Sequence, residues 1–270
     1  NLSQNEQKAL TVTKQLIALQ KEGKLNLDEI SQVFNSSSPV PIGVHSLYQM
    51  PPQISKMLPP TVIAHMLPGY RPSDLTLARA DIYLRETRNA SLAGDVIANA
   101  SHEFVHVLQR HADTSYYGIK NYTDDVQSLT TVSRTAQSIY QRLIAQGEKA
   151  LGQNAELNRR LKARPEFSIA DISRYLEKQG VFKNIDSDFA QMSQYALQGP
   201  LGYVLLQDPK LRSANMPELL KKWVKQHCDM EVEAYNVTIN ALKRYGKVNP
   251  DILTARSVIR AIHGALSKIV

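Results

Sequence analysis

Apolar residues recur at helical spacing over most of the chain, and this pattern predicts a largely helical protein. Near the N-terminus it indicates one helix over residues 3–22 and a shorter one over residues 27–34. Beyond residue 123 the same spacing, interrupted at glycines, predicts further helices over residues 124–149, 153–163, 168–179, 186–197, 216–245 and 250–269. We therefore expect a large helical C-terminal region.

Two segments depart from the helical pattern. Residues 39–73 hold eight of the 13 prolines, so we expect a loop-rich connector with short helices at most, such as residues 54–57 and 61–66. In residues 76–85 apolar and polar or aromatic side chains alternate, which predicts a half-buried strand. We expect an edge strand, which either serves only the fold or adds an extended peptide to the sheet.

A further long helix is predicted over residues 91–110, directly after this strand. Ser91 can cap its N-terminus, and Asp95 lies near its start. The apolar positions that indicate its burial are Val96, Ile97, Ala100, Phe104, Val107 and Leu108. The expected fold class is therefore α+β, mostly helical, with an edge strand before this helix. Residues 1–112 would form an N-terminal subdomain and residues 113–270 a helical C-terminal subdomain.

The composition and charge of the chain limit the kinds of binding partner that we expect. Hydrophobic residues make up 43% of the chain and charged residues 21%, which is ordinary for a soluble protein, and no apolar run is long enough to enter a membrane. The net charge is +7, but the basic clusters are short, so we interpret them as solvated helix faces and expect no nucleic-acid partner. The single cysteine, Cys228, is expected to be a packed side chain. The first residues show no signal-peptide pattern; we expect a soluble protein, and whether it is secreted stays open.

The candidate chemistry lies in the string His102-Glu-Phe-Val-His106. On a helix, positions four residues apart share a face, so both imidazoles can bind one metal ion beside the carboxylate of Glu103. Catalytic zinc requires this arrangement, with nitrogen ligands, an open position for water and a base next to it. The alternative is a surface helix with two unrelated histidines. An apolar helix argues against it, because burying these polar groups without a partner is costly.

A catalytic zinc site needs a third protein ligand, and several residues fail as candidates. His111 lies about half a turn round the helix from His102. The metzincin pattern requires glycine at position 109 and histidine at position 112, where this chain has Gln109 and Ala112. Asp113 stays open, because Asp113-Thr-Ser-Tyr-Tyr-Gly resembles the aspzincin pattern, although it lacks the preceding Gly-Thr and its spacing is one residue too long.

The segment Asp229-Met-Glu-Val-Glu-Ala-Tyr-Asn, together with the first motif, resembles the gluzincin zinc metallopeptidases. These two short motifs carry the whole resemblance. It implies that Glu231 is the third ligand. It also implies a residue that supports a ligand histidine at position 235, where Tyr235 replaces the usual Asp or Asn.

The helical pattern independently favours Glu231 over Glu233. On the predicted helix Glu231 falls near an inward stripe, whereas Glu233 lies about 200° away. The other residues of the stripe are Leu220, Val224, His227, Ala234, Thr238, Ala241 and Tyr245. A carboxylate on such a stripe needs a metal or a cationic side chain as partner. Glu233 and Asp113 remain the alternative third ligands.

The resemblance implies a zincin-like catalytic domain over residues 1–270 that binds Zn²⁺ through His102, His106 and Glu231. The implied activity is an endopeptidase in which Glu103 takes a proton from the attacking water and passes it to the leaving amine. The residues considered for stabilising the oxyanion are Tyr116, Tyr117, His227 and Tyr235.

Two other functions stay open. One is a catalytically idle zincin-like scaffold that binds a protein, and the other is a zinc hydrolase of a non-peptide amide or ester. The intact Glu103 argues against an idle site, which has no need of a base. The extra helices between the two motifs favour one specific protein substrate, as in secreted effector or toxin proteases. The oligomeric state stays open.

Overall fold

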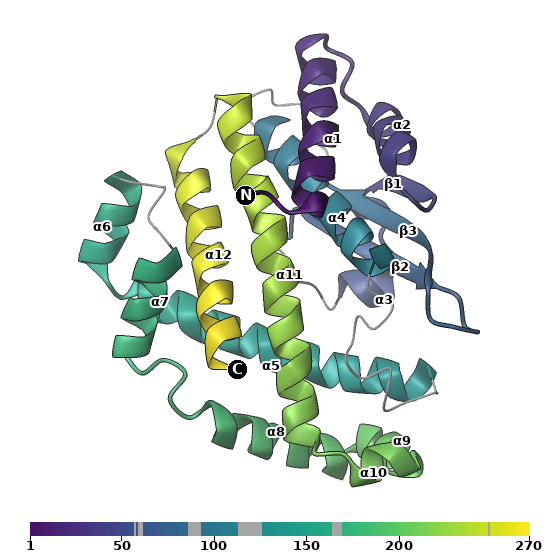
Figure 1. Cartoon of the computed structure of the whole chain (residues 1–270), viewed down its shortest axis with the longest axis vertical. Coiled ribbons are helices and arrows are strands. Elements are labelled where there is room, and N and C mark those ends of the chain that lie inside the picture. The colour runs from purple at the N-terminus through teal and green to yellow at the C-terminus, as the bar shows by residue number, and fades with distance from the viewer. Residues whose placement is uncertain (57, 59–61, 86–92, 113–125, 164–168, 248) are drawn as a thin grey trace. The chain divides into compact units, whose positions relative to one another are not determined.

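The computed structural model describes residues 1–56, 58, 62–85, 93–112, 126–163, 169–247 and 249–270. The described chain is mostly helical (Figure 1). In order, its elements are α1 (Gln4–Lys21), α2 (Leu27–Ser37), β1 (Ile42–Ser46), η1 (Leu47–Gln49), α3 (Pro52–Ser55), β2 (Ala64–Tyr70), β3 (Leu77–Leu84), α4 (Ala93–Ala112), α5 (Val126–Gly152), α6 (Ala155–Ala163), α7 (Ile169–Lys178), α8 (Ile185–Gln198), α9 (Pro200–Gln207), α10 (Pro209–Ser213), α11 (Met216–Tyr245) and α12 (Pro250–Ile269).

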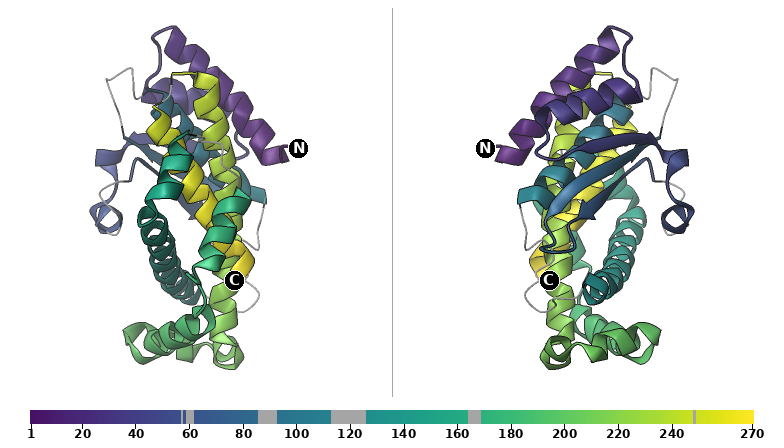
Figure 2. Two further views of the ribbon diagram at one scale, coloured as in Figure 1. Left: turned by 90° about the vertical axis from the view of Figure 1, so that its left-hand side faces the viewer. Right: turned by 90° about the vertical axis from the view of Figure 1, so that its right-hand side faces the viewer.

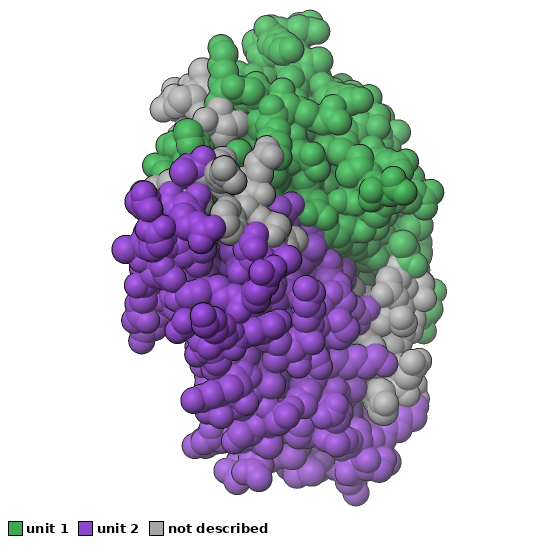
Figure 3. All heavy atoms as spheres, turned by 60° about the vertical axis from the view of Figure 1, so that its left-hand side comes forward, with its two compact units in different colours: residues 1–114, 233–256 green, residues 115–232, 257–270 purple. Residues whose placement is uncertain are grey.

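The chain divides into two compact units, which Figure 3 colours separately. Unit 1 comprises residues Asn1–Thr114 and Glu233–Arg256, and unit 2 comprises residues Ser115–Val232 and Ser257–Val270. The sequence pattern groups residues 113–270 together, whereas Glu233–Arg256 lie in unit 1. Helices α11 and α12 each contribute residues to both units.

The loop-rich connector expected over residues 39–73 is wrong in part, because it contains the strands β1 and β2. The short helix expected at residues 61–66 is replaced, where the structure describes it, by the start of β2. The prolines fit this sheet. Pro41 precedes β1, and Pro68 lies in β2 opposite Ala80 of β3. The N–H of Ala80 points away from β2 and donates to the Pro41 carbonyl, so Pro68 and Ala80 form no hydrogen bond with each other. The missing N–H of Pro68 therefore costs no bond to β3.

The strand expected over residues 76–85 is confirmed as β3, but the expectation that it is an edge strand is wrong. The sheet has the order β1–β3–β2, with β1 parallel and β2 antiparallel to the central β3 (Figure 2, right-hand view). Both edges of β3 are therefore occupied, so it cannot pair with an added peptide. At the outer edge of β1, the Asn35 side chain bonds both the N–H and the carbonyl of Ile42, which blocks that edge locally.

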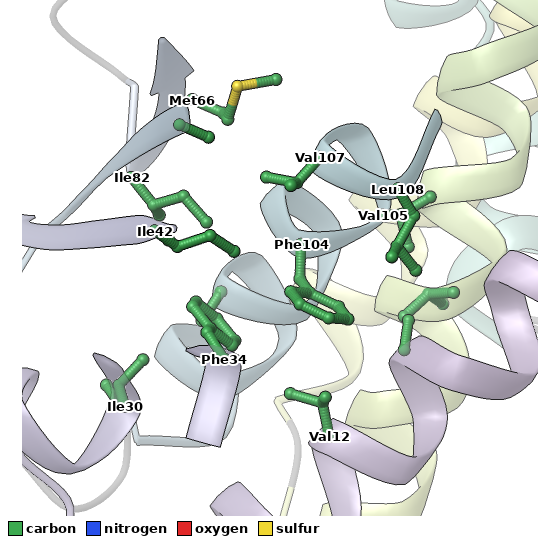
Figure 4. Close-up of a cluster of buried hydrophobic side chains, with 14 of the residues drawn as sticks. Val12, Ile30, Phe34, Ile42, Met66, Ile82, Phe104, Val105, Val107 and Leu108 are labelled. Carbon is green, nitrogen blue, oxygen red and sulfur yellow. The ribbon is translucent and has the colours of Figure 1, made fainter. Parts of the chain in front are cut away.

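Helix α4 lies in the core of unit 1. It packs against β2 and β3 on one side and against α1 on another (Figure 1). Figure 4 shows Phe104 of α4 next to Phe34 of α2, with strand side chains such as Ile82 directed at the same cluster. The two phenyl rings stack with centroids 5.1 Å apart. Burial of this face fixes the position of α4 and, with it, the direction of its histidines.

In unit 2 the helices α5, α7 and α8 match their predicted ranges to within a few residues. The sequence pattern missed α9 and α10. Gly199-Pro200 follows the helix predicted over residues 186–197, and Pro200 is also a favourable first residue of a new helix because its missing N–H would be unpaired there. Among the described helices, none combines the length with the apolar composition that a membrane-spanning segment requires.

Cys228 is expected to react with iodoacetamide far more slowly in the native protein than in the unfolded chain. The side chain is buried, and burial, followed by the negative charges of Glu231 and Asp229, raises the pKa of its thiol well above the ordinary value. The thiolate that reacts is therefore scarce at neutral pH. Mass spectrometry after timed labelling, with and without denaturant, measures the ratio, and equal rates would contradict this burial.

Candidate metal centre

Helix α4 brings His102 and His106 together, as their spacing predicts. Their side chains lie one helical turn apart and are 7% and 8% exposed. The rings meet edge to face with centroids 4.8 Å apart, and their Nε2 atoms are 3.1 Å from one another. The two nitrogens therefore point at a common position.

Glu231 joins these histidines. The ligand atoms of His102, His106 and Glu231 all lie within 4.8 Å of one another. Among the described residues, these three side chains form the group that could hold a metal ion. Helix α11 explains the placement. Ala234 and Val237 are buried in the same core as α4, and the helix continues without a break back to Glu231. The stripe inferred from the sequence thus faces α4 along this part of α11.

The ring orientation of His102 follows from Thr238. The Thr238 hydroxyl donates to the Ala234 carbonyl at 3.2 Å, as a helical threonine commonly does. Its oxygen lies 2.9 Å from Nδ1 of His102. In the tautomer whose Nδ1–H donates to this oxygen, the single N–H of a neutral imidazole is used there, so Nε2 carries a lone pair. Thr238 and the Tyr235 ring, whose centroid is 4.6 Å from that of His102, both contact this imidazole.

The ring of His106 is fixed in the same sense by Gln109. Nδ1 of His106 lies 2.8 Å from Oε1 of Gln109 and donates to it. The other end of this amide, Nε2 of Gln109, donates to Glu233 at 2.9 Å. Nε2 of His106 is therefore also an acceptor. Glu233, the alternative third ligand, contacts the amide that holds His106 and is not part of the cluster of ligand atoms.

The two Nε2 atoms are within hydrogen-bond distance of each other, and with both rings in the Nδ1–H tautomer their lone pairs and the carboxylate surround one position that suits a cation. The donor set fits zinc, since two histidine nitrogens and a carboxylate are the ligands of many catalytic zinc sites. Two nitrogens at the usual Zn–N length and a tetrahedral angle are roughly 3.4 Å apart, close to the observed separation. The arrangement can therefore hold a divalent metal with only a small adjustment of the side chains.

Glu103 is on α4 directly after His102 and is 8% exposed. Its carboxylate is on the buried helix that carries both histidines, and it is not one of the clustered ligand atoms. Its role as a general base stays a prediction.

Next to Glu231 lies a cluster of aromatic rings that the sequence did not indicate. His227 stacks on Trp223 with centroids 4.8 Å apart, and the Tyr140 ring meets it edge to face at 4.4 Å. Nε2 of His227 lies 3.7 Å from the Glu231 carboxylate. His227 and Tyr235 are therefore the oxyanion candidates found next to metal-binding residues. Tyr116, Tyr117, Asp113 and the capping residue Ser91 lie outside the described residues.

Thr238→Val is expected to weaken zinc binding by about 10- to 100-fold, the usual effect of removing a group that orients a ligand histidine. Valine has nearly the same shape but cannot accept from Nδ1 of His102. Competition with a chromophoric chelator measures the affinity. Thr254→Val is a matched control, because Thr254 is also buried and donates to a carbonyl one turn back. Equal effects of the two substitutions would show that Thr238 acts only on stability.

No protein-family model, curated protein or solved structure matches the sequence.

Proposed function

We propose that this protein is a zinc-dependent endopeptidase of gluzincin type, with His102, His106 and Glu231 as zinc ligands. The observation that carries the proposal is the convergence of two Nε2 atoms, 3.1 Å apart, with the Glu231 carboxylate. The partners at Nδ1 of both histidines support it, because each can accept the Nδ1–H of the tautomer that binds a metal through Nε2. Peptide hydrolysis, rather than hydrolysis in general, is supported by the resemblance of the two motifs.

Bound zinc would supply a Lewis acid that acidifies water and polarises a carbonyl group. Within the chain, Glu103 accepts a proton from the attacking water and donates it to the leaving amine, which departs as a neutral group. His227, next to Glu231, and Tyr235, next to His102, are the proposed donors of a hydrogen bond to the oxygen that gains negative charge.

Metal analysis and cleavage of a protein mixture together test this proposal. We expect near-stoichiometric zinc in the purified protein, and new peptide termini in the mixture that disappear after chelation and return when zinc is added. Absence of zinc after attempted loading would contradict the site. Zinc without peptide products would instead favour the non-peptide hydrolase or the idle scaffold. Indiscriminate digestion would contradict the expectation of one specific substrate.

A further inference from the structure

We propose that Glu233 is a positioning residue of this metal site, which sets the tautomer of His106 by orienting Gln109. The inference rests on the proposed function, because it assigns a role to a residue around the same metal. It also replaces an earlier alternative, in which Glu233 is itself a ligand.

The hydrogen-bonding chemistry of a carboxylate makes the orientation directional. An ionised carboxylate only accepts, so the group of Gln109 that faces Glu233 must be its NH₂. The carbonyl oxygen of Gln109 then faces His106, where it can only accept. Nδ1 of His106 must therefore carry the hydrogen, and Nε2 keeps the lone pair directed at the position it shares with His102. Without the carboxylate, the amide could turn over and present its NH₂ to Nδ1, which favours the opposite tautomer.

Glu233 is itself held by a second amide. Nδ2 of Asn5, in the first turn of α1, donates to the same Oε1 atom at 3.1 Å. Helices α1 and α4 pack against each other, so Asn5 and Gln109 approach the carboxylate from two helices of one core. The half-buried carboxylate thus accepts two hydrogen bonds that fix it in place. Glu233 also lies about 200° from Glu231 around the axis of α11. A ligand role would require it to leave both amides.

A double-mutant cycle on zinc affinity tests whether Glu233 acts through Gln109. We expect Glu233→Ala and Gln109→Ala each to weaken zinc binding by about 10- to 100-fold. We expect the double variant to be no weaker than the more affected single variant, since both substitutions break the same connection. Glu233→Gln keeps an acceptor for both amides but can also donate, so it should weaken zinc binding less than Glu233→Ala. Glu218→Ala, at an exposed position of the same helix, is the control.

A metal-free measurement keeps the inference separate from the proposed function. Nitrogen chemical shifts of His106 in the metal-free protein, at a pH where the ring is neutral, should show the Nδ1–H tautomer in the wild type and a mixture of tautomers in Glu233→Ala. Unchanged zinc affinity in Glu233→Ala, single effects that multiply in the double variant, or an unchanged tautomer would overturn the inference. A wild-type protein that binds no zinc but shows this tautomer shift would overturn the proposed function while leaving the orienting role of Glu233 intact.

Discussion

Glu231→Ala is expected to abolish stoichiometric zinc binding while leaving the fold intact. The substitution removes one of three ligands from a site that His102 and His106 alone would hold weakly. We expect the affinity to fall by more than the roughly 100-fold that the loss of a supporting residue causes. Elemental analysis of wild-type and variant proteins, purified in parallel and dialysed against the same zinc buffer, measures the loss.

Thermal unfolding provides an independent measurement of the same effect. A ligand at a free concentration of about 1,000 times its dissociation constant stabilises the native state by roughly 4 kcal/mol. Zinc should therefore raise the melting temperature of the wild type and of the exposed control Glu218→Ala, but not that of Glu231→Ala. Zinc retained by Glu231→Ala would instead move the third ligand to Glu233 or Asp113.

The long helices could be predicted from the sequence because their signals are local. The predicted ranges 216–245 and 250–269 match α11 and α12, and the short N-terminal helix begins at Leu27 as expected. Periodic apolar residues, with a glycine or proline at the ends, specify such elements without reference to the rest of the chain.

The sheet could be predicted only in part because its neighbours are set by distant contacts. Alternation in residues 77–84 identifies a strand and its two faces, but it contains no information on which strands lie beside it. Its partners β1 and β2 occur in a proline-rich segment whose local composition favours loops. Proline fits there because Pro41 precedes β1 and the backbone nitrogen of Pro68, within β2, faces away from β3.

The candidate site, too, could be predicted only where its signals are local to one helix. The spacing of His102 and His106 and the stripe containing Glu231 are properties of single helices, and the structure brings these three residues together. Thr238 lies on that stripe two turns after Glu231, and a polar residue at such an inward position indicates a partner for another buried polar group. Gln109 and Glu233 had no comparable signal, because their roles depend on how α1, α4 and α11 meet.

Glu103→Gln is expected to abolish most of the peptidase activity without loss of zinc. Glutamine has nearly the same shape but cannot accept the proton of the attacking water. General base catalysis contributes about 10²- to 10⁴-fold to the rate, so kcat/KM should fall by a factor in this range, or roughly 3 to 5 kcal/mol in transition-state stabilisation. Kinetics on a peptide identified in the cleavage screen, with zinc measured in the same preparations, tests both parts.

The comparison with Glu231→Ala separates the base from the metal site. If Glu103 acts only as a proton acceptor, Glu103→Gln keeps full zinc content and the zinc-dependent rise in melting temperature, whereas Glu231→Ala loses zinc and activity together. Loss of zinc in Glu103→Gln would mean that its carboxylate helps to hold the metal. Undiminished cleavage by zinc-loaded Glu103→Gln would assign the proton transfer to another group, with His227, 3.7 Å from the Glu231 carboxylate, the first to be substituted next.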